Sequence, residues 1–281
     1  GRRLCFESAG DASGRPVLIH SGTPGSRHIL ESHVRGAETT GVHLLKYDRP
    51  GYGLSTAHPG HTVADCANDV RDIASAFGIE RLAVWGAAGG GPRALACAAL
   101  LPDLVTSAAA LASLAPYGAE GLDFFAGMGQ ANIDGIRLQL DNPDAARAQS
   151  HRDRDEMLAI TADQMLTAYT EMLPPVDANV LTLELAVEGV LETQQALEPG
   201  DQGWWDDSVA QLAPWGFDLG EIRVPVQVWH GVQDRFVPVQ HGRWLATHVP
   251  DADIHILDNE GHLSLTNRHV PEVHRWLTSH D

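Results

Sequence analysis

The sequence of 281 residues is strongly acidic, and this property limits its partners. Its 37 aspartate and glutamate residues outnumber its 19 lysine and arginine residues, so the formal net charge is −18 at pH 7. Nucleic acids and anionic membranes attract basic patches, so we expect neither as a partner. Hydrophobic residues make up 43% of the chain, which is enough for one α/β domain with an insertion.

The first part of the chain alternates between expected strands and helices. In residues 62–77, Thr62 and Asp65 have the spacing of a capping box, and apolar residues recur at every third or fourth position. Strands are expected at 4–7, 17–20, 43–47, 81–85 and 105–113, and helices at 27–38, at 62–77 and after residue 90. This order predicts a mostly parallel sheet that is covered by helices on both faces.

Between about residues 118 and 219 this alternation stops. The segment is expected to form helices at 121–140, 144–172 and 177–196. After residue 224 the alternation resumes, and the last strand is expected at 253–257. We therefore divide the chain into an α/β core, residues 1–117 and 220–281, and a helical insertion, residues 118–219.

The cysteine pattern and the first residue of the chain indicate which cellular compartment to expect. Cys5, Cys66 and Cys97 are odd in number and form no C-x-x-C pair, so they predict no disulfide framework. A reducing, cytoplasmic location is therefore expected. Because the chain begins at Gly1 without methionine, we interpret the start as trimmed, and a secreted origin stays open. No stretch predicts a transmembrane helix.

A glycine-rich turn follows the expected strand at 81–85. It reads Gly86-Ala87-Ala88-Gly89-Gly90 and opens a predicted helix. A strand, a sharp glycine turn and a helix form the setting of a nucleophile elbow, G-x-S-x-G, but Ala88 occupies the serine position. The alternative is a glycine turn without chemistry. A phosphate-binding loop is disfavoured, because the sequence has no G-x-x-x-x-G-K-[ST].

Four other segments of the chain contain recognisable motifs, and two of them precede this turn while two follow it. Residues 20–26 read H-S-G-T-P-G-S, residues 48–55 read D-R-P-G-Y-G-L-S, residues 231–238 read G-V-Q-D-R-F-V-P, and residues 261–262 read G-H. Together with the turn they resemble the motifs of the α/β-hydrolase family, and they span nearly the whole chain. The resemblance implies an α/β-hydrolase fold in which the helical insertion forms a cap.

The resemblance also implies a role for individual residues. Ala88 stands in the nucleophile position, His262 would be the general base, and Asp234 would orient it. The backbone amides of Thr23 and Gly89 would form the oxyanion hole. Asp234 and Thr23 could instead be ordinary turn residues, and Asp123 is a weaker candidate for the acid.

The insertion also offers candidates for a substrate pocket. Phe124, Phe125 and Met128 could line an apolar pocket, whereas we expect most aromatic residues of the insertion to fix it on the core. The sequence has no H-E-x-x-H motif and no dinucleotide-binding G-x-G-x-x-G, so we expect neither a metal nor a cofactor. The expected partner is a small molecule with an apolar part, and the oligomeric state is not predicted.

These observations predict a serine-type hydrolase of an ester, thioester, lactone or amide bond that is inactivated at Ala88. We favour an engineered change from serine over natural loss, because the oxyanion loop and His262 both remain. Two alternatives stay open. His262 and Asp234 could act as a general-base pair in a lyase or a cofactor-free oxygenase, or the fold could serve a non-catalytic receptor.

Overall fold

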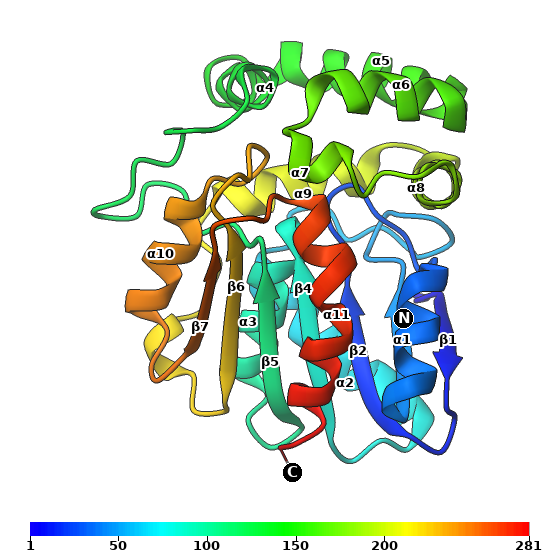
Figure 1. Cartoon of the computed structure of the whole chain (residues 1–281), viewed down its shortest axis with the longest axis vertical. Coiled ribbons are helices and arrows are strands. Elements are labelled where there is room, and N and C mark those ends of the chain that lie inside the picture. The colour runs from blue at the N-terminus through cyan, green and yellow to red at the C-terminus, as the bar shows by residue number, and fades with distance from the viewer. Residues whose placement is uncertain (281) are drawn as a thin grey trace.

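A seven-stranded sheet forms the centre of the computed structural model, which describes residues 1–280. The strand order is β1-β3-β2-β4-β5-β6-β7. Only β1 pairs antiparallel with its neighbour, and the other pairs are parallel. Helices cover both faces of the sheet (Figure 1). The predicted α/β class with a helical insertion is confirmed.

The elements of the core follow the expected alternation. The strands are β1 (Phe6–Gly10), β2 (Arg15–His20), β3 (Val42–Tyr47), β4 (Leu82–Ala87), β5 (Val105–Leu111), β6 (Val226–Gly231) and β7 (Asp253–Leu257). The helices are α1 (Glu31–Thr40), α2 (Cys66–Phe77), α3 (Gly91–Leu100), α10 (Val239–His248) and α11 (Leu263–Leu277), with short 3-10 turns at Val63–Asp65, Ala88–Gly90 and Leu219–Glu221. The capping box has formed at the start of the 3-10 turn that leads into α2, where Asp65 accepts a 2.7 Å hydrogen bond from the Thr62 amide.

The side chains of each strand alternate between the two faces of the sheet, and each face has its own hydrophobic core. Leu18 and Val84 belong to the cluster on the side of α2 and α3. Val17, Ile19 and Trp85 belong to the cluster with α11 on the opposite side. Because both faces are buried, a site has to lie at an end of the strands, and in open α/β sheets ligands bind outside the carboxyl ends.

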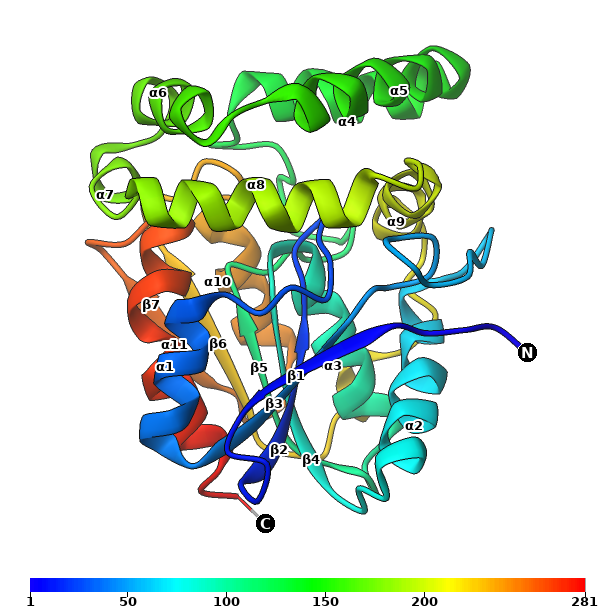
Figure 2. The same ribbon diagram turned by 90° about the vertical axis from the view of Figure 1, so that its right-hand side faces the viewer.

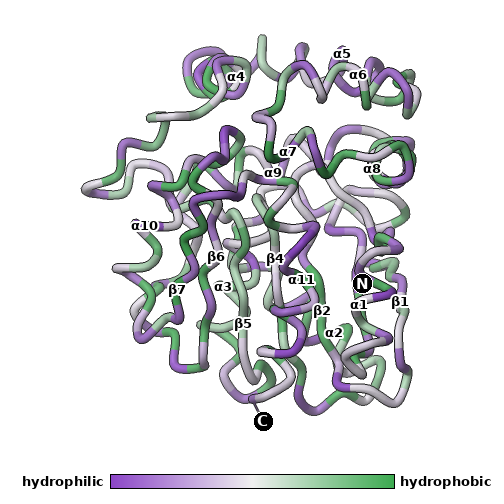
Figure 3. The backbone as a smooth tube through the Cα atoms, viewed as in Figure 1, coloured by the Kyte–Doolittle hydropathy of each residue, from purple (hydrophilic) through white to green (hydrophobic). Residues whose placement is uncertain are grey.

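Six helices form the inserted segment, and we call residues 130–212 the cap. They are α4 (Gln130–Asp141), α5 (Pro143–Ala159), α6 (Ala162–Met172), α7 (Pro175–Ala178), α8 (Leu183–Leu197) and α9 (Gln202–Leu212). Helices α7, α8 and α9 lie over the carboxyl ends of the strands, and α4, α5 and α6 form a second layer above them (Figure 2). Figure 3 shows that hydrophilic residues are frequent on α4 and α5, where burial is sparse.

All three predicted helices of the insertion differ from the structure, and the helix expected at 177–196 is interrupted at residues 179–182, between α7 and α8. The segment 121–129 is a series of turns, because Gly121 and Gly127 adopt positive φ angles of 78° and 87°. The expected helix at 144–172 is broken at residue 161, where the Thr161 side chain accepts a hydrogen bond from the Gln164 amide and starts α6. Within the part of the chain that the structure describes, no helix combines the length and apolar character needed to cross a membrane.

Candidate active site

Ala88 lies at a strained turn between β4 and α3. Its φ angle is +49°, a left-handed value that costs a residue with a Cβ about 1–2 kcal/mol. The turn is also tightly packed. A Cβ at Gly86 would overlap the carbonyl group of Gly90, and a Cβ at Gly90 would overlap the carbonyl oxygens of His20 and Ser21. The backbone therefore has the form of a nucleophile elbow although residue 88 has no nucleophile.

The loop after β2 lies against this turn. A Cβ built at Gly22 would be 3.8 Å from the Ala88 methyl group, and one built at Gly89 would be 3.1 Å from the Cβ of Thr23. Three predicted site residues, Thr23, Ala88 and Gly89, are therefore neighbours. The Thr23–Pro24 peptide bond is cis. Within residues 1–280 the Thr23 amide has no protein hydrogen-bond acceptor, so it is free for a ligand.

His262 and Asp234 form a hydrogen-bonded pair at the ends of β7 and β6. Nδ1 of His262 lies 2.7 Å from Oδ2 of Asp234. The other carboxylate oxygen accepts hydrogen bonds from the amides of Phe236 at 2.8 Å and Val237 at 2.9 Å. The His262 side chain is 13% exposed, whereas that of Asp234 is fully buried. Asp234 is thus held by its own turn, and Nε2 of the imidazole is left for a reacting group.

Burial lowers the pKa of His262, but the nearby carboxylates outweigh this effect. The charge of Asp234 and its hydrogen bond stabilise the imidazolium form, and the charge of Asp177 adds to them. The net result is a pKa raised above the usual value of 6.5. A histidine that gains a proton readily is suited to the role of a general base.

Asp177 is a functional candidate that the sequence analysis missed. It belongs to α7 of the cap and its side chain is fully buried. Its carboxylate accepts hydrogen bonds from the amides of His262 at 2.9 Å and Ser264 at 2.8 Å. A Cβ at Gly261 would overlap this carboxylate, which explains why glycine precedes the histidine. The cap therefore holds the loop that carries His262.

A second buried carboxylate of the cap, Asp207 of α9, was also missed. Its Oδ2 accepts hydrogen bonds from Nε of Arg49 at 2.8 Å and from a terminal nitrogen of the same guanidinium at 2.6 Å. Its Oδ1 lies 2.5 Å from a guanidinium nitrogen of Arg93 and 3.2 Å from Nε2 of His61. Asp207 is fully buried, and Arg49 and Arg93 are nearly so.

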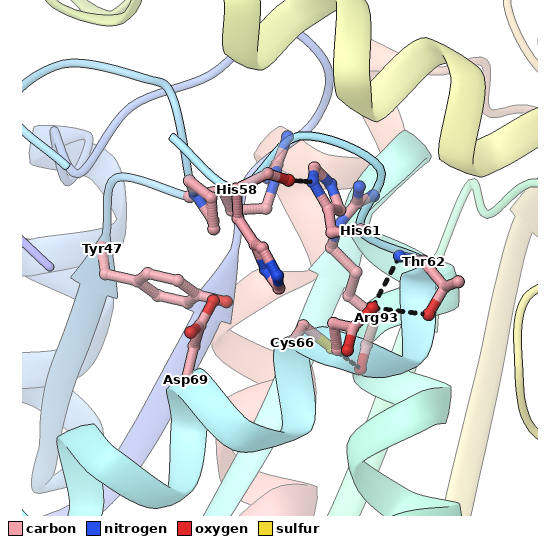
Figure 4. A pocket seen from close by; sticks show the side chains of 10 residues that line it. Tyr47, His58, His61, Thr62, Cys66, Asp69 and Arg93 are labelled. Atoms are coloured by element: carbon pink, nitrogen blue, oxygen red, sulfur yellow. Dashed lines mark hydrogen bonds between the residues drawn. The ribbon is translucent and has the colours of Figure 1, made fainter. Parts of the chain in front are cut away.

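The charges around Asp207 shift the pKa values of the group. Burial alone would raise the pKa of Asp207, but Arg49, Arg93 and then the hydrogen bond to His61 hold it far below its usual range. Burial opposes protonation of His61, yet its hydrogen bond to Asp207 raises its pKa above 6.5. Beside the group is a cavity of about 10 Å³, roughly the space of one water molecule, lined by His58, His61 and Arg93 among others (Figure 4).

The remaining candidates lie elsewhere. Asp123 caps its own turn by accepting a hydrogen bond from the Ala126 amide at 3.2 Å. The Phe124 ring packs edge-on against His241 of α10, with ring centres 4.7 Å apart. A cavity of about 400 Å³ lies between α8 and the core, and its lining residues are Arg27, His28, Gly53, Leu54, Leu191, Gln194, Gln195, Glu198 and Pro199. Phe124, Phe125 and Met128 do not line it, and their place in a substrate pocket stays a prediction.

In residues 1–280 one group of side chains lies close enough to share a metal ion: His20, Cys66 and Cys97. The Cys97 sulfur is 3.5 Å from Nε2 of His20 and 3.9 Å from the Cys66 sulfur. Burial raises the pKa of the Cys97 thiol well above its usual value. A metal binds the thiolate, so a buried neutral thiol favours the alternative, a chain of weak hydrogen bonds in the core.

Comparison with known proteins shows the family of the chain. Residues 15–268 match the model of the alpha/beta hydrolase fold family. The chain belongs to this family. A 2-hydroxy-6-oxononadienedioate/2-hydroxy-6-oxononatrienedioate hydrolase of Burkholderia vietnamiensis is 26% identical over 92% of this chain and 84% of its own length.

Two further proteins are similar to the chain along most of its length. A 2-hydroxy-6-oxo-6-phenylhexa-2,4-dienoate hydrolase of Burkholderia cepacia is 24% identical over 88% of this chain and 80% of its own. The solved structure of an esterase from Exiguobacterium antarcticum has a TM-score of 0.72 at 17% identity, and the match covers 99% of this chain and 96% of the esterase. The latter likeness concerns the fold alone.

Proposed function

We propose that the site is that of a nucleophile–His–Asp hydrolase in which Ala88 has replaced the nucleophile. The observation that carries the proposal is the left-handed φ angle of +49° at Ala88, on a turn whose flanking glycines leave no room for a Cβ. A backbone bent in this way presents the side chain of residue 88 at the carboxyl end of β4, on the edge of the sheet where β6 and β7 end at Asp234 and His262.

With serine at this position, each part has a task. The hydroxyl oxygen of that serine would attack the acyl carbon while His262 takes its proton and later passes it to the leaving group. Asp234 would stabilise the resulting imidazolium, and the amides of Thr23 and Gly89 would hold the oxyanion. Water would then cleave the acyl-enzyme. In the chain as it stands the first bond cannot form, because a methyl group has no electron pair to donate.

The proposed substrate is a small molecule with an apolar part and an ester, thioester, lactone or amide bond. The match to the alpha/beta hydrolase fold family supports hydrolysis of such a bond, whereas the cavity beside α8 is lined mostly by polar residues and carries no argument for the substrate. The relatives of the Burkholderia species are named for hydroxy-oxo-dienoates. We therefore include a carbon–carbon bond beside a carbonyl among the bonds to be tested.

The test is the change Ala88→Ser. We expect fluorophosphonate labelling and hydrolysis of p-nitrophenyl esters to appear with it, since removal of such a nucleophile lowers turnover by about a million-fold. The matched control is Ala87→Ser, which places the same hydroxyl one residue earlier. The panel also contains a thioester and 2-hydroxy-6-oxo-6-phenylhexa-2,4-dienoate. Equal and negligible activity of both variants on the whole panel would refute the proposal.

A second function is favoured by one observation. The His262–Asp234 pair is intact at 2.7 Å, and the pKa of His262 is raised, although no nucleophile is present. His262 as a general base could abstract a proton from a bound ligand in a lyase or a cofactor-free oxygenase reaction. Turnover by the unaltered chain that is lost on His262→Gln would support this function. Tight ligand binding without turnover in any form would indicate a receptor instead.

A further inference from the structure

One face of α9 contacts the loops around Ala88 at three successive turns. Gly203, Asp207 and Gln211 are spaced by four residues and therefore lie in a row along the helix. A Cβ at Gly203 would lie 2.6 Å from the carbonyl carbon of Gly51, so only glycine permits this close approach. Nε2 of Gln211 donates a 2.7 Å hydrogen bond to Oγ1 of Thr23.

Asp207, in the middle of this row, neutralises only part of the positive charge around it. One carboxylate faces two buried guanidinium groups, those of Arg49 and Arg93. The remaining donors of these groups point at backbone carbonyl oxygens and, in the case of Arg49, also at Oγ1 of Thr23 at 3.2 Å. Arg49 donates to the oxygens of Ser21 at 2.6 Å and Gly22 at 2.8 Å. Arg93 donates to the oxygen of Gly89 at 2.6 Å.

The contact with the Gly22 oxygen has a direct consequence for the oxyanion hole. The Gly22 carbonyl and the Thr23 N–H belong to the same peptide group. A cation bound to the oxygen of a peptide fixes the plane of that peptide and polarises its N–H, because linked hydrogen bonds strengthen one another at low dielectric. The Thr23 amide therefore becomes a better-oriented and stronger donor. Arg93 binds the Gly89 oxygen and fixes the plane of the peptide between Gly89 and Gly90 in the same way.

We propose that α9 of the cap is a positioning element of the oxyanion hole, with Asp207 holding Arg49 and Arg49 holding the Gly22–Thr23 peptide. The proposal deepens the proposed function and rests on it for its catalytic meaning. Without Asp207, the guanidinium of Arg49 would be buried without a counter-ion, and it would move toward water and release the carbonyl oxygens of the loop. The cap thus completes the site as well as covering it.

The first experiment uses the chain as it exists, with Ala88. Hydrogen exchange is measured by mass spectrometry in Asp207→Asn and in the matched control Asp201→Asn. Asp201 is a buried cap carboxylate as well, but it pairs with Arg147 within the cap. We expect peptides covering residues 18–27 and 86–95 to exchange faster in Asp207→Asn by about tenfold, the lower limit for losing a charge-assisted hydrogen bond. The control should leave them unchanged.

The second experiment measures turnover in the Ala88→Ser background. We expect Asp207→Asn to lower kcat by about 10- to 100-fold with little change in KM, since loss of one oxyanion donor lowers kcat by about 100- to 1,000-fold. Arg49→Lys should have the same effect, because a single ammonium cannot bind both the carboxylate and two carbonyl oxygens. A purely electrostatic role for Arg49 would instead leave Arg49→Lys active.

The outcomes separate the two proposals. If Ala88→Ser is inactive on every substrate, the proposed function fails, and hydrogen exchange still decides whether α9 holds the loop. Unchanged exchange at 18–27 in Asp207→Asn, or equal effects of Asp207→Asn and Asp201→Asn, would overturn the inference. If Asp207→Asn does not fold, Gln211→Ala provides the test, because it removes the hydrogen bond to Thr23 without leaving a buried charge unpaired. Unchanged exchange in that variant would also count against the inference.

Discussion

The cap is attached to the two halves of the candidate site by two buried aspartates with different partners. Asp177 accepts two hydrogen bonds from neutral backbone amides of the loop with His262. Asp207 binds two guanidinium groups and a histidine on the oxyanion side. The first arrangement leaves a negative charge near His262, which raises the pKa of that residue. The second leaves an excess of positive charge on the guanidinium groups, which also donate hydrogen bonds to backbone carbonyl oxygens.

This difference shows that burial alone does not determine how much a contact between the cap and the core contributes to stability. Both aspartate side chains are fully buried, but removal of one leaves only amides unsatisfied, and removal of the other leaves charges unpaired. A buried charge that is left unpaired lowers the free energy of unfolding more than a buried amide that is left unpaired. Loss of Asp207 should therefore destabilise the chain more than loss of Asp177.

The largest loss of stability is expected from Asp207→Ala. The two guanidinium groups lose their counter-ion inside the protein, and the free energy of unfolding should fall by about 3–5 kcal/mol. Urea denaturation followed by tryptophan fluorescence measures the change. The double variant Asp207→Ala, Arg49→Met should recover part of the loss, because it removes one of the unpaired charges. A loss below about 1 kcal/mol would mean that water or other groups replace the carboxylate.

Asp177→Ala should have a smaller effect. It leaves the amides of His262 and Ser264 without an acceptor, and we expect the free energy of unfolding to fall by about 3 kcal/mol or less. Asp177→Asn keeps one acceptor oxygen and should cost less. Both changes remove a negative charge near His262, so the pKa of that histidine should decrease. NMR titration of the His262 ring proton measures it, and an unchanged pKa would show that Asp234 alone sets the value.

A pH-dependent effect is expected from His61→Gln. Asp207 raises the pKa of His61 above 6.5, so the folded chain binds this proton more tightly than the unfolded chain. The resulting stabilisation is fully present below pH 6.5 and is lost as the pH rises through the folded-state pKa. The difference in unfolding free energy between the original chain and the variant should therefore shrink as the pH increases. Comparison at each pH cancels the titration of histidines that the two proteins share.

The smallest effect is expected at an ion pair that also joins cap and core but is exposed. Arg35 of α1 and Glu184 of α8 lie 3.5 Å apart, with 60% and 68% of their side chains exposed. Solvent screens such pairs, so Arg35→Ala should change the free energy of unfolding by no more than about 0.5 kcal/mol. A larger change would show that the exposed fraction of this ion pair does not explain why it contributes less to stability than Asp177 and Asp207.

The sequence predicted the fold because its signals are local. Alternating strands and helices, the capping box at Thr62 and the glycines around Ala88 each reflect a backbone requirement that a few neighbouring residues decide. The predicted helix over residues 121–129 was wrong because Gly121 and Gly127 adopt positive φ angles there, and hydrophobic spacing alone does not reveal such turns.

The site was predicted less completely. Proximity of His262 to Asp234 followed from the motifs in which they occur, and their roles stay predictions. Asp177 and Asp207 were missed because the helical insertion contains many aspartates, and burial depends on how a helix is oriented on the core. The only available signal was the spacing of Gly203, Asp207 and Gln211, which marks one face of a helix but not its partner.

The bend at residue 88 has a practical consequence. Because the main chain already holds the left-handed conformation, the proposed active and inactive forms differ by a single oxygen atom attached to one carbon. Their crystals should be isomorphous, and a difference map between them should contain one isolated peak. A substrate soaked into the alanine form would then be seen whole, in the pose that precedes bond cleavage.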